Sequence, residues 1–188
     1  MPPALSPRAC SLPKSWTRST NVNDAALLGV VSARPALRRL LFDPGAIVAV
    51  LNRHQVRFVV IGGMAAMVRD LPVPATVDID ITPARDTDNL ERLASAFDEL
   101  EAGLLTADRG GTWFPRHPIS NWAQYDTLHL MTKYGPLDLV FAPDGAARGY
   151  DDLEALADGQ RVAGSDALVI TVATWERLKE ASGRAKDL

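Results

Sequence analysis

The sequence predicts an α/β fold of the α+β kind, in which helices pack on a small mixed and largely antiparallel sheet. Segments with apolar residues at helical spacing alternate along the chain with short strand-like apolar runs. Two of the predicted strand pairs are joined by turns of a few residues, around 133–136 and 164–166, and such short turns connect antiparallel neighbours. With 47% apolar and 23% charged residues among 188, the composition is that of one globular domain with an appendage.

Residues 1–42 are predicted to form a basic, largely disordered leader that precedes a domain at 43–188. Residues 1–24 are rich in Pro, Ser and Thr and show no period, and 25–42 carry weak helical patterning that is broken at Pro35. Residues 1–40 hold six basic residues and one acidic residue, a net +5, whereas the remaining 148 hold 14 basic and 22 acidic residues, a net −8. The leader is either an RNA-contacting arm or a flexible tail. The acidic body argues against broad non-specific nucleic-acid binding but allows an RNA end to dock locally.

The predicted domain opens with a helix, a strand and a Gly-Gly turn. Asp43 and Pro44 suit the N-cap and first turn of a helix that runs to about Arg53. A strand over 56–61 then stops at Gly62-Gly63, and a short helix over 64–69 follows. Because glycine has no Cβ, the backbone of this turn can approach a triphosphate closely, and its N–H groups can bind the anion.

A second strand, over 77–81, carries two carboxylates. Successive side chains of a strand alternate between faces, so Asp78 and Asp80 share one face with Cα atoms roughly 6.5–7 Å apart, and Ile79 and Ile81 face the core. Such a carboxylate pair is costly unless a cation lies between its members, and Mg²⁺ suits carboxylate oxygens and substrate phosphates. The plainer alternative is a strand-end cap and an exposed pair. Thr76 either lines the same site or is an ordinary strand threonine.

The second half of the domain is predicted from the same two periodicities. A helix over 87–102 starts at a cap, Asp86 or Thr87, and residues 108–121 are expected to form a loop. Strand 125–132 turns tightly into strand 137–141, with Leu128 and Leu130 on one face and Thr127, His129 and Met131 on the other. A helix over 150–157, a hairpin of 161–163 with 167–170, and a last helix over 173–182 complete the chain.

A third carboxylate, Asp138, lies in the strand 137–141, which the tight turn places near the strand of Asp78 and Asp80. Further candidate ligands are weaker, since each also has an ordinary surface role. They are phosphate ligands at His54, Arg69 and Lys133, and base-stacking aromatics at Trp113, Phe114 and Trp122. Neither His117 nor His129 has the spacing of a zinc ligand, and the single cysteine, Cys10, excludes a disulfide framework.

The ordered set Gly62-Gly63, Asp78-x-Asp80 and apolar-Asp138-apolar resembles the motifs of the DNA polymerase β-like nucleotidyltransferase superfamily. The resemblance implies a polymerase β-type fold and a metal-dependent transfer of a nucleotide from an NTP such as ATP. It also implies one or two Mg²⁺ ions held by the three aspartates. Gly62 and Gly63 would then hold the β- and γ-phosphates.

The C-terminal run 173–188 is similar to the end of the AbiEii-type, MenT-like toxin nucleotidyltransferases, so that the resemblance spans about 43–188. In that group a helix lysine meets the triphosphate, a role that falls on Lys179, and Asp187 matches the acidic position that follows. The implied function is a toxin that modifies RNA, with the tRNA 3′ end as the expected acceptor and an antitoxin protein as partner. Many relatives have Gly-Ser where this chain has Gly62-Gly63.

Three other functions stay open on the sequence alone. One is an antitoxin-like transferase that nucleotidylates a partner protein, another is a nucleotidyltransferase with a small-molecule acceptor, and the third is a non-catalytic binding domain of the same fold. The nucleotide and the oligomeric state have no readable signal. No apolar run reaches the ~20 residues that cross a bilayer, and residues 1–20 lack the apolar core of a secretory signal. We therefore expect a cytoplasmic location.

Overall fold

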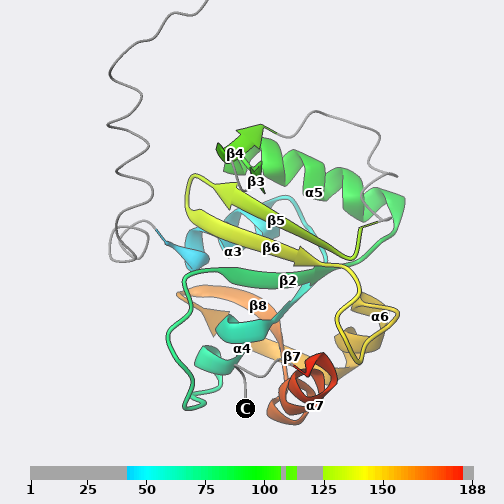
Figure 1. Ribbon diagram of the computed structural model, residues 1–188. Helices are drawn as coiled ribbons and strands as arrows, with labels where there is room; N and C mark the ends of the chain where they lie inside the picture. Colours follow the sequence, from blue (N-terminus) through cyan, green and yellow to red (C-terminus); the bar gives the residue numbers. More distant parts are fainter. Residues whose placement is uncertain (1–41, 107–108, 114–124, 184–188) are drawn as a thin grey trace, which may run out of the picture. The chain divides into compact units, whose positions relative to one another are not determined.

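The computed structural model describes residues 42–106, 109–113 and 125–183, all of which belong to one compact unit, Arg34–Leu188 (Figure 1). The predicted α/β fold is confirmed. In chain order the elements are α3 (Pro44–Arg53), β1 (Phe58–Ile61), α4 (Gly62–Val68), β2 (Ile79–Pro83), α5 (Thr87–Leu100), β3 (Gly103–Thr106), β4 (Arg109–Trp113), β5 (Thr127–Thr132), β6 (Gly135–Val140), α6 (Tyr150–Leu153), a 3-10 turn (Glu154–Leu156), β7 (Ala157–Val162), β8 (Ser165–Ile170) and α7 (Val172–Ser182).

The strands form an eight-stranded sheet in the order β4-β3-β5-β6-β2-β1-β8-β7. Two pairs are parallel, β2 with β6 and β1 with β8, and the other five pairs are antiparallel. The sheet is therefore mixed and largely antiparallel, as predicted. The central strand β1 is buried along its whole length because it reads as a continuous apolar run, Phe-Val-Val-Ile.

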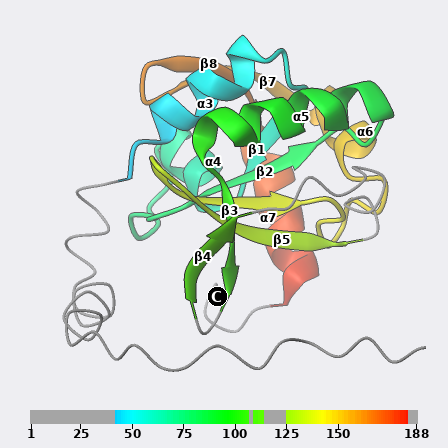
Figure 2. The same ribbon diagram turned by 90° about the horizontal axis from the view of Figure 1, so that it is seen from above.

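One face of the sheet is covered by α3 and α5, which lie side by side in Figure 2, while α7 lies on the opposite side. The start of α3 is the predicted one: Asp43 accepts a hydrogen bond from the N–H of Ala46 at 2.9 Å, and Pro44 follows it. The helix α5 is likewise capped by Asp86, which accepts from the N–H of Asn89 at 3.1 Å. The apolar sides of both helices and the inward side chains of the central strands form one core.

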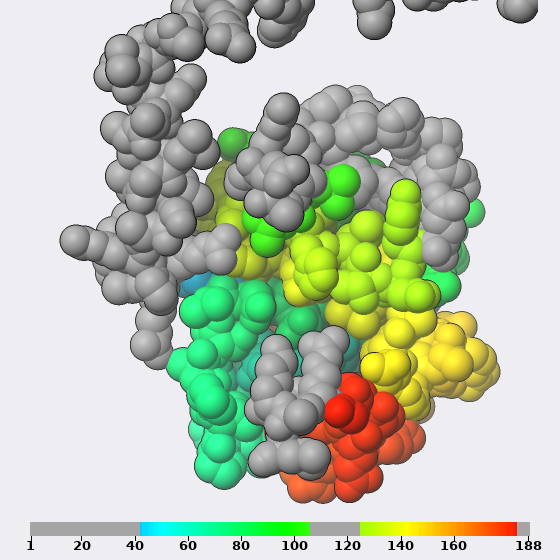
Figure 3. Space-filling model, viewed as in Figure 1, coloured from blue at the N-terminus to red at the C-terminus, as the bar shows by residue number. Residues whose placement is uncertain are grey.

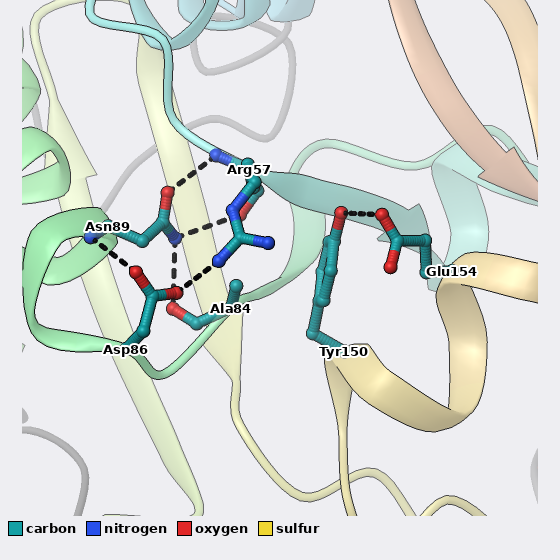
Figure 4. Close-up of polar contacts among 6 residues, drawn as sticks. All are labelled: Arg57, Ala84, Asp86, Asn89, Tyr150 and Glu154. Carbon is teal, nitrogen blue, oxygen red and sulfur yellow. Dashed lines mark hydrogen bonds and ion pairs between the residues drawn. The ribbon is translucent and has the colours of Figure 1, made fainter.

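A fully buried amide ties α5 to the ends of β1 and β2 (Figure 4). The Asn89 side chain accepts from the Arg57 N–H at 2.7 Å and donates to the carbonyls of Arg57 and Ala84 at 3.0 and 2.9 Å. The Arg57 guanidinium lies over the Tyr150 ring, 5.6 Å from its centre, which brings α6 against the same point. A buried polar group left unpaired costs about 1–3 kcal/mol. The hydrogen bonds of Asn89 therefore stabilise the arrangement in which β2, the strand that carries Asp80, meets α5.

Some predicted boundaries were wrong. Residues 109–113 form the edge strand β4 rather than part of a loop, since an edge strand pairs on one side only and tolerates its two glycines. The helix predicted over 150–157 stops at Leu153, because Ala157 already pairs with Ile170 in the β7–β8 hairpin. The helix predicted over 87–102 ends at Leu100, where Glu101 takes the left-handed conformation.

No helix among the described residues has the length and apolar character needed to cross a membrane. The sequence-based roles of the leader up to residue 41, of Phe114, His117 and Trp122, of the Trp113 side chain, and of Asp187 lie outside the described residues.

Candidate active site

Two of the three predicted carboxylates lie on neighbouring strands. In β2, Ile79 and Ile81 are fully buried, so Asp80 between them projects from the other face. Asp80 is opposite Asp138 in the parallel pairing of β2 with β6, where adjacent strands are about 4.8 Å apart. The sequence prediction that Asp138 lies beside the Asp78/Asp80 strand thus agrees with the sheet.

The first carboxylate lies just outside the strand. The strand predicted over 77–81 begins at Ile79, so Asp78 belongs to the turn before β2. There the Thr76 hydroxyl donates to the Asp78 carboxylate and contacts the Asp78 carbonyl at 3.3 Å. Thr76 therefore orients Asp78, and it lies outside the lining of the cavity described below.

Burial and nearby charges raise the pKa of Asp80 and of Asp138. The pKa of Asp80 is raised to about 7, chiefly by burial and then by the negative charges of Asp78 and Asp138, while the Gly63 N–H and the Lys179 ammonium oppose the rise. Burial also raises the pKa of Asp138, and the hydrogen bond from His129 opposes that rise. A cation bound at Asp80 would neutralise the repulsion from Asp78 and Asp138 that helps to raise its pKa.

The Gly-Gly turn packs directly against Asp80. Gly62 has a φ of +64°, and a Cβ built on it would lie 2.0 Å from Oδ2 of Asp80. A Cβ on Gly63 would lie 3.0 Å from the Thr76 hydroxyl oxygen. Glycine suits both positions because a side chain on Gly62 would collide with Asp80 and one on Gly63 would crowd Thr76.

Of these groups, Gly62, Gly63 and Asp80 line a cavity of about 330 Å³ at the end of the sheet, whereas Asp78 and Asp138 lie outside its lining. Its lining includes Gly62, Gly63, Asp80, Asp126, Trp175 and Lys179. Figure 3 shows the segments that contribute to it, the region around α4, the β5–β6 region and α7, gathered on one face of the molecule. The volume suits a ligand the size of a nucleotide, which falls within the usual range for small-molecule pockets.

The wall formed by α7 carries the predicted cation. Lys179 lines the cavity, and its charge opposes the raised pKa of Asp80. The ammonium nitrogen of Lys179 lies 5.5 Å from the centre of the Trp175 ring, one helical turn earlier. The Trp175 indole N–H donates to the Gly62 carbonyl at 3.0 Å, which joins α7 to the Gly-Gly turn.

The carboxylates fit a magnesium ion that also uses substrate oxygens. Among residues 42–106, 109–113 and 125–183, no three His, Cys, Asp or Glu side chains are grouped closely enough to hold a metal by themselves. Mg²⁺ rarely needs such a cage, since it keeps several waters and binds one or two carboxylates together with phosphates. Asp80, with Asp78 and Asp138 raising its pKa, provides that donor chemistry.

Three side chains that the sequence offered as candidate phosphate ligands contact other groups instead. Arg69 donates to the carbonyls of Ile170 and Val169 at 3.1 and 2.8 Å and forms an ion pair with Asp158. Lys133 lies 3.5 Å from a carboxylate oxygen of Glu101, and His54 lies 2.7 Å from Glu99. None of the three lines the cavity.

His129 contacts Asp138, and this contact was not predicted from the sequence. Its Nδ1 lies 2.7 Å from Oδ2 of Asp138, and the two residues face each other across β5 and β6. The signal was present, because the tight turn pairs Thr132 with Gly135, and counting back from that pair places His129 opposite Asp138. Zinc-ligand spacing is a pattern along the sequence, whereas this contact runs across the sheet.

The fold is similar to that of a solved protein from Thermotoga maritima, whose structure is described as that of a "putative nucleotidyltransferase". The likeness has a TM-score of 0.50 at 18% identity and covers 81% of this chain and 88% of the other. No protein-family model and no curated protein sequence matches the chain. At this identity the likeness establishes a nucleotidyltransferase-like fold, whereas the AbiEii-type, MenT-like subgroup rests on sequence resemblance alone.

The Asp80 carboxyl makes the metal-free protein less stable as the pH rises. Its folded pKa of about 7 lies above its ordinary value near 4, so the folded state binds this proton more tightly than the unfolded chain. The stabilising contribution is complete below pH ~4 and is lost as the pH rises through ~7, by up to about 4 kcal/mol. We expect Asp80→Asn to match wild type in thermal unfolding near pH 4 and to exceed it at pH 8. A difference that does not change with pH would contradict the raised pKa, and added Mg²⁺ should narrow the gap at pH 8.

Proposed function

We propose that the protein is a Mg²⁺-dependent nucleotidyltransferase that moves a nucleoside monophosphate from an NTP to an acceptor hydroxyl. The observation that carries the proposal is the pairing of Asp80 with Asp138 across β2 and β6, together with a cavity that Asp80, Gly62, Gly63 and Lys179 line. Phosphoryl-type transfer needs carboxylates that bind a metal, backbone N–H groups that approach the phosphates, and a cation that faces the triphosphate. The aspartates, the two glycines and Lys179 would supply these groups.

The chemistry divides among these residues. Asp78 and Asp80 would hold Mg²⁺, with Asp138 completing a second metal site, and the metal would supply charge neutralisation on the triphosphate. The acceptor oxygen attacks the α-phosphorus, the bond from that phosphorus to the bridging oxygen breaks, and pyrophosphate leaves. The acceptor proton would go to Asp138, the carboxylate paired with Asp80 across β2 and β6. Gly62 and Gly63 would contact the β- and γ-phosphates.

Lys179 would act mainly on nucleotide binding. It lies on α7 across the cavity from the carboxylates, so its ammonium can meet the triphosphate. We expect Lys179→Met to raise the KM for the NTP by roughly tenfold or more, as loss of one charge-assisted hydrogen bond implies. Lys133→Met is the matched control, because Lys133 pairs with Glu101 away from the cavity and its loss should leave KM unchanged. Equal effects of the two substitutions would contradict this role.

The acceptor is proposed to be RNA, with the tRNA 3′ end as the first candidate. The support is the similarity of the C-terminal run 173–188, which contains Lys179, to the end of the AbiEii-type, MenT-like toxins, together with the Asp78-x-Asp80 pair. On this proposal the protein is the toxin of a toxin–antitoxin pair that works in the cytoplasm, and an antitoxin protein is its partner.

A transfer assay tests the proposal and identifies the acceptor. The purified protein is incubated with Mg²⁺, each α-labelled NTP in turn, and total RNA, cell lysate or a panel of small hydroxyl compounds. Label on RNA that chelation and Asp80→Asn both abolish supports the proposal and identifies the nucleotide. Label on a protein would favour the antitoxin-like alternative, and label on a small molecule would favour that acceptor. No label from folded protein with any acceptor would favour a non-catalytic binding domain.

A further inference from the structure

The peptide between Gly62 and Gly63 has a defined direction in this structure. Its carbonyl oxygen accepts the hydrogen bond from the Trp175 indole at 3.0 Å. Its N–H, which belongs to Gly63, is on the side of Asp80 and opposes the rise of the Asp80 pKa. Because the carbonyl and N–H of a planar trans peptide point in opposite directions, the Trp175 hydrogen bond and this contact agree on one orientation.

The peptide lies in the first turn of α4 (Gly62–Val68), so the helix supplies part of its orientation. It joins two glycines, and Gly62 has a φ of +64°; because glycine populates positive and negative φ about equally, this turn deforms more easily than the rest of the helix. Turned over, the peptide would direct the Gly62 carbonyl oxygen toward the Asp80 carboxylate, and two acceptors would then face each other. The Trp175 hydrogen bond opposes that arrangement from the side of α7.

The same indole also contacts the cation of the site. Lys179 follows Trp175 by one helical turn on α7, and its ammonium lies 5.5 Å from the ring centre. Trp175 thereby connects two parts of the cavity wall that are more than a hundred residues apart in sequence: the Gly-Gly turn after β1 and the lysine of α7.

We propose that Trp175 is a positioning residue that holds the Gly62–Gly63 peptide with its N–H toward Asp80 and the cavity, and that holds the Lys179 ammonium through its ring. The kinetic part of this inference rests on the proposed function, whereas the orientation of the peptide does not. On this proposal, the packing of α7 and the orientation of the Gly62–Gly63 peptide depend on each other.

The two contacts are separated by Trp175→Phe, which keeps an aromatic ring beside Lys179 and removes the N–H donor. The direct readout is the ¹⁵N–¹H spectrum of the unliganded protein. The Gly63 amide is expected to shift and to lose hydrogen-exchange protection by about tenfold, the equivalent of one hydrogen bond. An unchanged Gly63 amide in the folded variant would overturn the inference, whether or not the protein transfers nucleotides.

A kinetic split distinguishes positioning from mere packing. We expect Trp175→Phe to lower kcat by about tenfold with little change in the KM for the NTP, since the loss falls on orientation rather than on charge. Trp175→Leu, which also removes the ring, should additionally raise KM as Lys179→Met does. Equal kcat in wild type and Trp175→Phe would overturn the catalytic part.

If neither variant folds, the wild-type protein still decides the matter. A long-range HNCO experiment is expected to show a coupling across the hydrogen bond from the Trp175 indole nitrogen to the Gly62 carbonyl carbon. Rapid exchange of that indole proton with solvent, without the coupling, would overturn the inference.

Discussion

Replacement of Asp80 by asparagine is expected to lower nucleotidyl transfer by at least about 10³-fold while the fold is retained. A carboxylate that holds a catalytic metal supplies several kcal/mol of transition-state stabilisation, and a loss of roughly 4 kcal/mol corresponds to a factor of 10³. Asparagine fills the same volume but brings no charge to the ion. The fold should tolerate it because the Asp80 carboxylate, buried between Asp78 and Asp138, is itself costly to ionise.

The control for this substitution is Asp126→Asn. Asp126 lines the same cavity but is not among the causes of the raised pKa of Asp80, and it lies just before β5 rather than on β2 or β6. Steady-state transfer rates and circular dichroism are measured for both variants. If Asp80→Asn is folded and keeps more than about a tenth of the wild-type rate, the metal role of Asp80 is wrong. If Asp126→Asn is equally inactive, the three-carboxylate account is incomplete.

The second large effect is expected from Gly62→Ala. A Cβ at this position would lie 2.0 Å from Oδ2 of Asp80, so the carboxylate or the turn has to move. The φ of +64° adds about 1–2 kcal/mol of strain for any residue other than glycine. We expect transfer to fall by about 10²-fold, because displacement of a reacting group by about 1 Å has that effect.

Gly183→Ala separates the collision from the backbone strain. Gly183 has a φ of +57°, close to that of Gly62, but a Cβ there would meet nothing within 4 Å. The backbone strain should cost both variants about 1–2 kcal/mol in denaturant unfolding, the collision should add to this loss in Gly62→Ala, and only Gly62→Ala should lose the transfer activity. If Gly183→Ala reduced activity to the same extent, general destabilisation rather than displacement of Asp80 would explain the result.

Local patterns predicted most of the fold. The apolar run of β1, the alternation of Leu128 and Leu130, and the Asp43-Pro44 helix start all reflect short-range preferences that read the same in the sequence and in the structure. The edge strand β4 could not be predicted in this way, because Arg109-Gly-Gly-Thr-Trp has no apolar alternation and is a strand through its pairing with β3.

The parts of the site that depend on the sheet were harder to predict. Asp138 was assigned correctly to a strand, but its partner His129 is set by the register of β5 and β6. The contact of Trp175 with Gly62 spans residues 113 positions apart and depends on where α7 packs, so no local pattern reports it. Tertiary contacts of this kind become visible only when the strands and α7 are in place.

The most direct test of the central claim compares two positions of label in the same NTP. If the site performs nucleotidyl transfer, label at the α-phosphate appears on the acceptor, and label at the γ-phosphate appears in an equal amount of pyrophosphate. Both signals require Mg²⁺ and are absent in Asp80→Asn. Label from the γ-phosphate on the acceptor, with none from the α-phosphate, would mean that the site is a phosphotransferase and would contradict the account.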